Sequence, residues 1–206
     1  MSNLFYQAQG RRPVLEQARG VYMWDKDGKR YLDGSSGAMV CNIGHSNQEV
    51  LTAMRRQMEK STFGYRLHFE TEASERLAQK LAGLMPGDLN RVFFVSGGSE
   101  AVESATKLAR QYALTQGQGS RSKVISRFPS YHGRTFGALD LTGYDPLRKP
   151  FAPMMQGMPK IAAPATYLDR DNLTEEQRGL KYAEYLRDKI IEEGPDTVLA
   201  FIMEPV

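Results

Sequence analysis

The sequence predicts an α/β fold in which helices flank a mostly parallel sheet, with a small N-terminal α+β segment in front. Two short apolar runs, residues 92–95 and 198–203, are typical of strands buried on both faces, and residues 123–126 are expected to form another strand. Stretches with helical spacing separate these runs, and such strand–helix–strand alternation favours a parallel sheet. A glycine-containing turn over residues 96–99 leads from the first run into its helix.

The N-terminal segment carries the signals of short strands and two helices. Residues 21–24 and 30–32 flank a turn-rich stretch that contains Asp-Gly, a pattern that predicts a β-hairpin. Ser46 and Glu49 have the spacing of a capping box, so a helix is expected to start there. A second helix is expected over residues 72–84, where Pro-Gly follows and ends it.

Further helices and one short strand complete the prediction. Residues 150–164 are rich in proline and methionine and are expected to form mostly loop, with a strand over residues 160–162. Thr174 and Gln177 open a helix that is expected to run to about residue 193. The helix after the glycine turn has four apolar residues on one face: Ala101, Ala105, Leu108 and Tyr112.

Composition excludes several classes of protein. The 206 residues carry 27 basic and 24 acidic side chains, a net charge of +3, without the basic stripe of a nucleic-acid-binding protein. No apolar run reaches the roughly 18 residues of a membrane span, and the N-terminus lacks the features of a signal peptide. The single cysteine, Cys41, excludes an intrachain disulfide, so a reducing, cytoplasmic compartment is expected. The chain stops just after a buried-looking strand, where sites of α/β sheets form, and is therefore expected to be truncated.

The turn of Ser96, Gly97, Gly98 and Ser99 is a candidate anion site. Its glycines let backbone N–H groups approach a ligand, and the following helix offers unpaired donors at its N-terminus. Ser99 adds a hydroxyl group, so the turn suits a phosphate. The alternative is a structural strand-to-helix turn in which Ser99 is the N-cap. The turn is neither a Walker A loop, since no lysine follows the second glycine, nor a Gly-x-Gly-x-x-Gly motif.

Two further candidates are expected at the same edge of the sheet. Tyr131 and His132 follow the strand over residues 123–126, and an aromatic ring at that place can stack on a planar ligand. Glu204 follows the strand over residues 198–203, so its carboxylate also lies at a carboxyl end. The alternatives are a packed or hinge tyrosine, a loop histidine and a surface glutamate.

Other polar residues favour structural roles. His45, His68 and His132 lie far apart in the sequence, without the carboxylate spacing of a metal site, so no metal is expected. Cys41 has no local nucleophile context and is expected to be buried.

Five stretches of the chain resemble a known family: Tyr31-Leu32-Asp33-Gly34, Asn42-Ile43-Gly44-His45, the ten residues from Phe94 to Glu103, Tyr131-His132-Gly133-Arg134-Thr135 and Met203-Glu204-Pro205. In this order they resemble the class III pyridoxal-phosphate-dependent aminotransferases, the group of ω-amino acid, ornithine and 4-aminobutyrate transaminases. The likeness covers the chain from about Val21 onward. It implies the fold-type I architecture, with residues 1–60 in the small domain and residues 61–206 in an incomplete large coenzyme-binding domain.

The resemblance also implies roles for particular residues. Gly98 and Ser99 would hold the phosphate of pyridoxal 5'-phosphate, and Tyr131 would stack on its ring. His132, in the same loop, is assigned to the same cofactor site. Glu204 would lie near the coenzyme, where relatives pair this glutamate with an arginine from later in the chain.

The resemblance implies that the full-length parent is a homodimeric transaminase, which moves an amino group from an amine or amino acid to a keto acid. Met39 stands where relatives line the substrate pocket. The lysine that forms the Schiff base with the coenzyme would lie beyond Val206, so no catalytic residue is assigned here and residues 1–206 alone are expected to be inactive. The alternatives are a non-catalytic fragment that acts as a binding or interaction protein, and a different α/β enzyme with a phosphate-bearing ligand.

Overall fold

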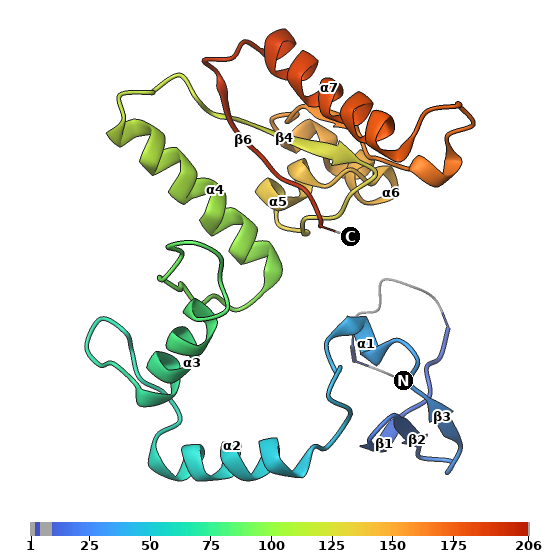
Figure 1. Ribbon diagram of the computed structural model, residues 1–206. Coiled ribbons are helices and arrows are strands. Elements are labelled where there is room, and N and C mark those ends of the chain that lie inside the picture. Colours follow the sequence, from blue (N-terminus) through green and yellow to red (C-terminus); the bar gives the residue numbers. More distant parts are fainter. Residues whose placement is uncertain (1–2, 5–9, 206) are drawn as a thin grey trace. The chain divides into compact units, whose positions relative to one another are not determined.

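The computed structural model of the chain describes residues 3–4 and 10–205, and it divides into two compact units between Arg91 and Val92 (Figure 1). The first unit contains β1 (Leu15–Arg19), β2 (Tyr22–Asp25), β3 (Arg30–Leu32), α1 (Ser36–Met39), α2 (Gln48–Lys60) and α3 (Glu72–Ala82). The second contains α4 (Gly98–Thr115), β4 (Lys123–Phe128), α5 (Phe136–Leu141), α6 (Asp145–Arg148), the 3-10 helix η1 (Lys149–Met154), β5 (Lys160–Ala162), the 3-10 helix η2 (Thr166–Leu168), α7 (Glu175–Glu193) and β6 (Val198–Phe201). The predicted domain boundary after residue 60 falls inside the first unit, at the end of α2, and stays a prediction.

A three-stranded antiparallel sheet of order β1-β2-β3 occupies the first unit. The predicted hairpin is confirmed as β2 and β3, whereas β1 was not predicted. Asp25 organises the hairpin loop, because its carboxylate accepts hydrogen bonds from the backbone N–H of Asp27 and Lys29 at 3.0 and 2.9 Å. The same carboxylate accepts the Tyr31 hydroxyl at 2.6 Å, so one buried acid closes the turn.

The start of α2 differs from the predicted capping box. Asn47 is the N-cap, and its Oδ1 accepts the backbone N–H groups of Glu49 and Val50 at 3.1 and 3.2 Å. Ser46 instead donates its hydroxyl to the carbonyl oxygen of Ala18 at 2.8 Å, which ties the helix start to β1. The prediction that Ser46 caps the helix is therefore wrong, because the side chain of Asn47, and not that of Ser46, accepts the free N–H groups of the first turn.

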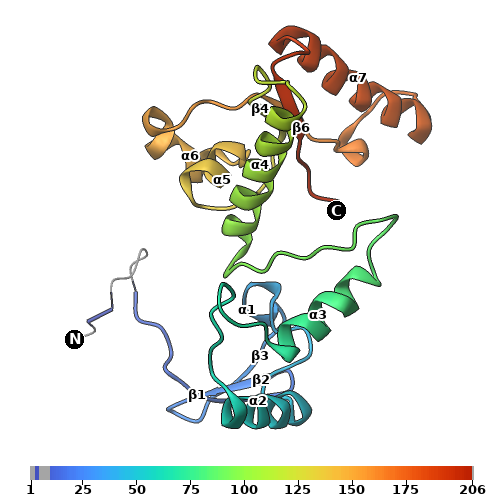
Figure 2. The ribbon, with the colours of Figure 1, turned by 90° about the vertical axis from the view of Figure 1, so that its left-hand side faces the viewer.

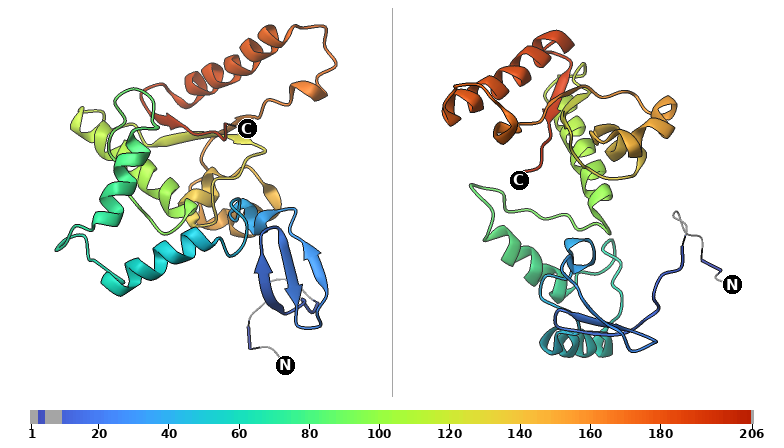
Figure 3. Two further views of the ribbon diagram at one scale, coloured as in Figure 1. Left: turned by 60° about the horizontal axis from the view of Figure 1, so that its bottom comes forward. Right: turned by 90° about the vertical axis from the view of Figure 1, so that its right-hand side faces the viewer.

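A parallel sheet of order β5-β4-β6 forms the centre of the second unit. The helix α7 packs against one face of this sheet, and α4 and α5 pack against the other (Figure 3). Figure 2 shows α4 lying along β6. The sheet core consists of Ile125, Ile161 and Val198, with Leu186, Ile190 and Phe201 packed around them. The predicted strands at residues 123–126, 160–162 and 198–203 and their parallel pairing are confirmed.

Residues 92–95 do not form the predicted buried strand. They are extended but belong to neither sheet of the described part of the chain, and Val95 is 37% exposed. A strand forms only where a neighbouring strand offers hydrogen-bonding groups. The apolar pattern of this segment does not show whether such a neighbour is present. The apolar face of α4 is exposed too, with Leu108 at 67%.

The other long helices lie where the sequence predicts them. The helix α7 begins with the predicted capping box, in which Thr174 Oγ1 accepts the Gln177 N–H and the Gln177 side chain accepts the Thr174 N–H. The helix α3 begins after Thr71 and covers the range expected for it. Within residues 3–4 and 10–205, no helix is long and apolar enough to cross a membrane.

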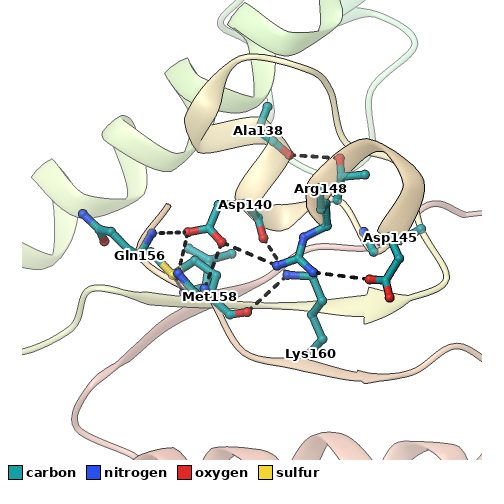
Figure 4. Close-up of polar contacts among 12 residues, drawn as sticks. Ala138, Asp140, Asp145, Arg148, Gln156, Met158 and Lys160 are labelled. Atoms are coloured by element: carbon teal, nitrogen blue, oxygen red, sulfur yellow. Dashed lines mark hydrogen bonds and ion pairs between the residues drawn. The ribbon is translucent and has the colours of Figure 1, made fainter. Parts of the chain in front are cut away.

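Residues 136–158 contain short helices that the sequence did not predict, and one buried carboxylate holds the end of this stretch. Asp140 of α5 accepts the backbone N–H groups of Gln156, Gly157 and Met158 at 3.0, 3.1 and 3.1 Å (Figure 4). The guanidinium of Arg148 lies 3.9 Å from the same carboxylate. This anchor places the chain immediately before β5.

Lys160 opens β5 beneath this anchor. Its Nζ donates to the carbonyl oxygens of Asp140 and Met158 at 2.5 and 3.2 Å (Figure 4). Burial is the main cause that lowers the pKa of Lys160, the positive charge of Arg148 acts in the same direction and Asp140 opposes it, and together they bring this pKa to about 8.

Candidate functional site

The serine–glycine turn and the loop after β4 contact each other through Ser99. The Oγ of Ser99, in the first turn of α4, accepts the backbone N–H of Arg134 at 3.0 Å. Gly133 allows this approach, because its φ is +138° and a Cβ there would lie 2.6 Å from Ser99 Oγ. The structure thus brings together the two segments that the sequence placed at one sheet edge.

Glu103 forms a second link between the same segments. Its Oε1 accepts the Thr135 hydroxyl at 2.7 Å and the Gly137 N–H at 3.0 Å. Sequence analysis included Glu103 in a family stretch but gave it no role. Its spacing of four residues from Ser99, which places both on one face of a helix, was the available signal.

The N-terminus of α4 is not capped by Ser99. Gly97 is the N-cap and makes no side-chain cap bond, and the Ser99 Oγ is directed to Arg134 instead. The alternative that Ser99 is the N-cap is therefore wrong. Glu100 accepts the backbone N–H of Ser96 at 2.7 Å, which satisfies a donor that lies before the helix.

Glu204 joins the end of β6 to the loop after β4. Its Oε1 accepts the backbone N–H of Tyr131 at 2.6 Å, and its Oε2 lies 3.8 Å from the guanidinium of Arg127. Arg127 also donates to the main-chain oxygen of Glu204. Sequence analysis missed Arg127, although a charged residue near the end of a buried strand was a visible signal.

Tyr131 and Glu204 line one cavity of about 510 Å³. Arg127, Ser130 and Tyr144 also line it. The Tyr131 ring is 52% exposed, so one of its faces is available to a ligand. A half-exposed aromatic ring held beside a carboxylate–guanidinium pair suits a planar ligand with a polar edge.

His132 lies deeper than Tyr131. Its backbone N–H donates to Thr142 Oγ1 at 2.9 Å, and its buried Nε2 has no hydrogen-bond partner among the described residues. Burial lowers the pKa of His132, with the positive charges of Arg127 and Lys160 acting in the same direction and Glu204 opposing them. The imidazole is therefore neutral at pH 7 and can accept or donate one hydrogen bond.

Met39 lies in the first unit, in the short helix α1, and its side chain is 79% exposed. Its role in a substrate pocket stays a prediction. No three His, Cys, Asp or Glu side chains within the described ranges converge as metal ligands. The remaining arrangement, a helix start and an aromatic loop at the carboxyl edge of a parallel sheet, is typical of α/β proteins that bind phosphate-bearing ligands.

Comparison with known proteins identifies the family. The family model for aminotransferase class-III matches residues 6–206, and the chain therefore belongs to this family. It is 42% identical to an uncharacterized aminotransferase, YodT, of Bacillus subtilis over 94% of its own length. It is 35% identical to the putrescine–pyruvate aminotransferase of Pseudomonas aeruginosa, again over 94% of its length.

Solved structures of transaminases have the same fold over the whole chain. An (S)-enantioselective omega-transaminase from Thermomicrobium roseum is 37% identical, with a TM-score of 0.92 over 100% of this chain and 47% of its own. An amine transaminase from an uncultivated Pseudomonas species, solved in its PLP-bound form, is 27% identical, with a TM-score of 0.90 over 100% of this chain and 49% of its own. The two curated relatives are covered over 44% and 42% of their lengths, so the chain spans less than half of these proteins.

Proposed function

We propose that the protein to which this chain belongs is a pyridoxal-phosphate-dependent transaminase that moves an amino group from an amine or amino acid to a keto acid. The observation that carries this proposal is the contact between Ser99 and the loop of Tyr131. It combines a donor for a phosphate and a surface for an aromatic ring in one small region. Family membership and the PLP-bound relative support the same ligand.

The first turn of α4 would bind the coenzyme phosphate. The backbone N–H groups of Gly98 and Ser99 belong to the helix start, where anions are stabilised by unpaired donors and by the helix dipole. Ser99 Oγ accepts one hydrogen bond from Arg134, which leaves its O–H free to donate to a phosphate oxygen. The Glu100 carboxylate is bonded to Ser96 and does not occupy these donors.

Tyr131 would cover one face of the coenzyme ring, and Glu204 would hold the loop that presents it. Bound pyridoxal phosphate supplies the electron sink that withdraws charge from the substrate. Glu204 keeps Tyr131 in place through its main-chain N–H, and Arg127 holds Glu204. His132, neutral and buried, would offer its Nε2 as a hydrogen-bonding group near the same site.

The partners, compartment and domain division are part of the same proposal. The substrates would be a small amino donor and a keto-acid acceptor, and the assembly would be a homodimer in the cytoplasm. A single cysteine supports a reducing compartment. Residues 61–206 would belong to the coenzyme-binding domain and Met39 to the substrate pocket.

Substitution of Ser99 and Tyr131 in the full-length protein tests the coenzyme site. We expect Ser99→Ala to weaken coenzyme binding by about 1.5–3 kcal/mol, because it removes a hydrogen bond to a charged group. Ser104→Ala, at a half-buried position farther along α4, is the matched control and should leave coenzyme binding unchanged. Tyr131→Ala should weaken binding more than Tyr131→Phe, since the ring face makes the contact. A coenzyme titration in which Ser99→Ala matches the wild type would refute the phosphate assignment.

Borohydride reduction with pyridoxal phosphate tests whether residues 1–206 hold the reactive lysine. We expect diffuse labelling of the ten lysines and no amino-group transfer to pyruvate. Lys160 has the lowered pKa that favours such chemistry, but two carbonyl oxygens bind its Nζ. Stoichiometric labelling of one lysine together with transfer would show a complete catalytic site within this chain.

A further inference from the structure

Three side chains of the first unit form a hydrogen-bonded line that the coenzyme site does not use. Cys41 Sγ lies 3.4 Å from His45 Nδ1, and His45 Nε2 lies 2.8 Å from Asp33 Oδ2. Cys41 is half-buried and not fully buried as predicted, and its thiol lies beside an imidazole. Sequence analysis missed the group because a tight turn, and not a recognisable motif, brings the thiol and the imidazole together.

The backbone around this group fixes the imidazole. His45 and Gly20 exchange two backbone hydrogen bonds, at 2.8 and 3.0 Å, which attach the histidine to the end of β1. Gly44 permits this contact, since its φ is +80° and a Cβ there would lie 3.1 Å from the Gly20 oxygen. The turn before it is closed by the Gly44 N–H, which donates to the Cys41 oxygen at 2.9 Å.

Asp33 is fixed as firmly. Its backbone N–H donates to the Val21 oxygen at 2.9 Å, and its Oδ1 accepts the Gly37 N–H at 3.2 Å. The side chain is only 6% exposed. The contact with His45 lowers the pKa of Asp33, and the hydrogen bond from Gly37 acts in the same direction. Asp33 is therefore a carboxylate at neutral pH and can only accept hydrogen bonds.

The charge of Asp33 determines the tautomer of His45. A carboxylate accepts at Nε2, so Nε2 must carry the proton of the neutral imidazole. The lone pair of the ring is then on Nδ1, which faces the Cys41 thiol. Cys41, His45 and Asp33 thus have the order of a nucleophile, a base and a group that orients the base. This arrangement activates cysteine in unrelated proteins.

We propose that Cys41 is a nucleophilic thiol and a site of covalent oxidation by hydroperoxides, with His45 as its general base and Asp33 as the positioning residue. The thiol proton moves to His45 Nδ1. The sulfur then attacks one peroxide oxygen, an S–O bond forms and the O–O bond breaks. The leaving oxygen takes the proton from the imidazolium and departs as an alcohol or water. The sulfur loses two electrons to the peroxide and becomes a sulfenic acid.

A metal site does not explain the group. Within the described residues, no three such side chains converge on one point, and His45 bridges its two neighbours with opposite ring nitrogens. The side-chain contacts of Cys41 and His45 are with each other and with Asp33. These contacts offer a path for the thiol proton of Cys41 to His45 Nδ1, with Asp33 bound to the opposite ring nitrogen.

The pH dependence of alkylation by iodoacetamide tests the proposal. Cys41 is the single cysteine of residues 1–206, so in this chain every cysteine adduct reports on this site. The reference is a peptide of residues 39–43, which contains the thiol without the histidine. We expect the alkylation rate of Cys41 to reach half of its maximum at a lower pH than in the peptide, because the thiolate is the nucleophile and His45 Nδ1 lies where it can accept the thiol proton. A half-buried thiol can react slowly, so the apparent pKa of the profile is the readout, and it does not depend on access.

Two substitutions and one control separate the roles of the partners. His45→Gln should return the apparent pKa to that of the peptide, and Asp33→Asn should shift it part of the way. His68→Gln, which changes a histidine in an edge-to-face contact with Tyr65, should leave the profile of the wild type unchanged. Circular dichroism checks the fold of each variant, and the wild type against the peptide remains decisive if a variant unfolds.

Peroxide treatment followed by a sulfenic-acid trap is the second readout. The wild type should form the trapped adduct faster than the peptide at pH 7, and His45→Gln should lose this advantage. A wild-type alkylation profile that superimposes on that of the peptide would overturn the proposal. Adduct formation no faster than in the peptide would overturn the oxidation step.

Discussion

Two segments of the second unit that the sequence predicts as strands have different structures. Residues 123–128 form β4, which lies between β5 and β6, and its Ile125 is completely buried. Residues 92–95, all apolar, are extended but belong to neither sheet, and Val95 is partly exposed. Local propensity favours a strand in both. The difference shows that burial and pairing with neighbours, more than the residues themselves, decide whether an apolar run becomes a strand.

The partners of β4 are held in place by polar contacts outside the sheet. On one side, Asp140 binds the chain that enters β5. On the other, Arg121 donates to the Val198 oxygen at 2.7 Å, where β6 begins. No such anchor was visible in the sequence, because each joins residues far apart along the chain.

The largest expected effect comes from truncation inside the paired strand. Ile125→Ala should lower the free energy of unfolding by about 2–5 kcal/mol, because it leaves a cavity in the sheet core. Val95→Ala, in the segment that belongs to neither sheet, should change it by about 0.5 kcal/mol or less. Urea unfolding followed by circular dichroism measures both. Similar losses for the two variants would mean that residues 92–95 are packed in solution.

Removal of the Asp140 charge should weaken the pairing of β5 with β4. Asp140→Asn replaces an oxygen that accepts backbone N–H groups by a donor, and should cost about 1.5–3 kcal/mol of unfolding free energy. Asp145→Asn, in the exposed ion pairs of α6, is the matched control and should cost about 0–1 kcal/mol. Equal costs in thermal or urea unfolding would contradict the anchoring role.

Hydrogen exchange compares the two segments without substitution. The Ser126 N–H donates to the Pro159 oxygen and the Ile202 N–H to the Ile125 oxygen, so both should exchange only on unfolding of the sheet. The amides of Phe94 and Val95 should exchange with an opening free energy of about zero. NMR of the labelled chain resolves these amides, and protection at residues 94–95 would show a partner for that segment in solution.

The smallest expected effect is a pH dependence from Lys160. Its pKa is about 8 in the folded chain and about 10.4 when unfolded, so the unfolded state binds more protons between these values. Stability should therefore rise as the pH increases through this window. Lys160→Met should flatten the rise, whereas Lys149→Met, on the exposed surface of η1, should keep it. A rise that persists in Lys160→Met would assign it to another group.

The sequence by itself determined the fold class and the order of the site segments. The strand patterns at 123–126 and 198–203 predicted β4 and β6, although β6 ends at Phe201, and the capping box of Thr174 predicted α7. These signals are local: side-chain pattern and hydrogen bonds within three residues. The family resemblance rests on local stretches too. Parallel topology then places Tyr131 and Glu204 at one edge, since the carboxyl ends of parallel strands coincide, and Ser99 joins them through its hydrogen bond from Arg134.

Tertiary structure alone decided which signals prevailed and which groups meet. It left residues 92–95 out of both sheets, gave the cap of α2 to Asn47, and brought Arg127 to Glu204 across 77 residues. It also placed Asp33, His45 and Cys41 in one line, a relation that depends on the hairpin and on the contact at Gly20. The physical reason is the same in each case. The path of the whole chain determines which hydrogen-bond partner or neighbouring strand a residue meets, and the residues next to it in the sequence do not.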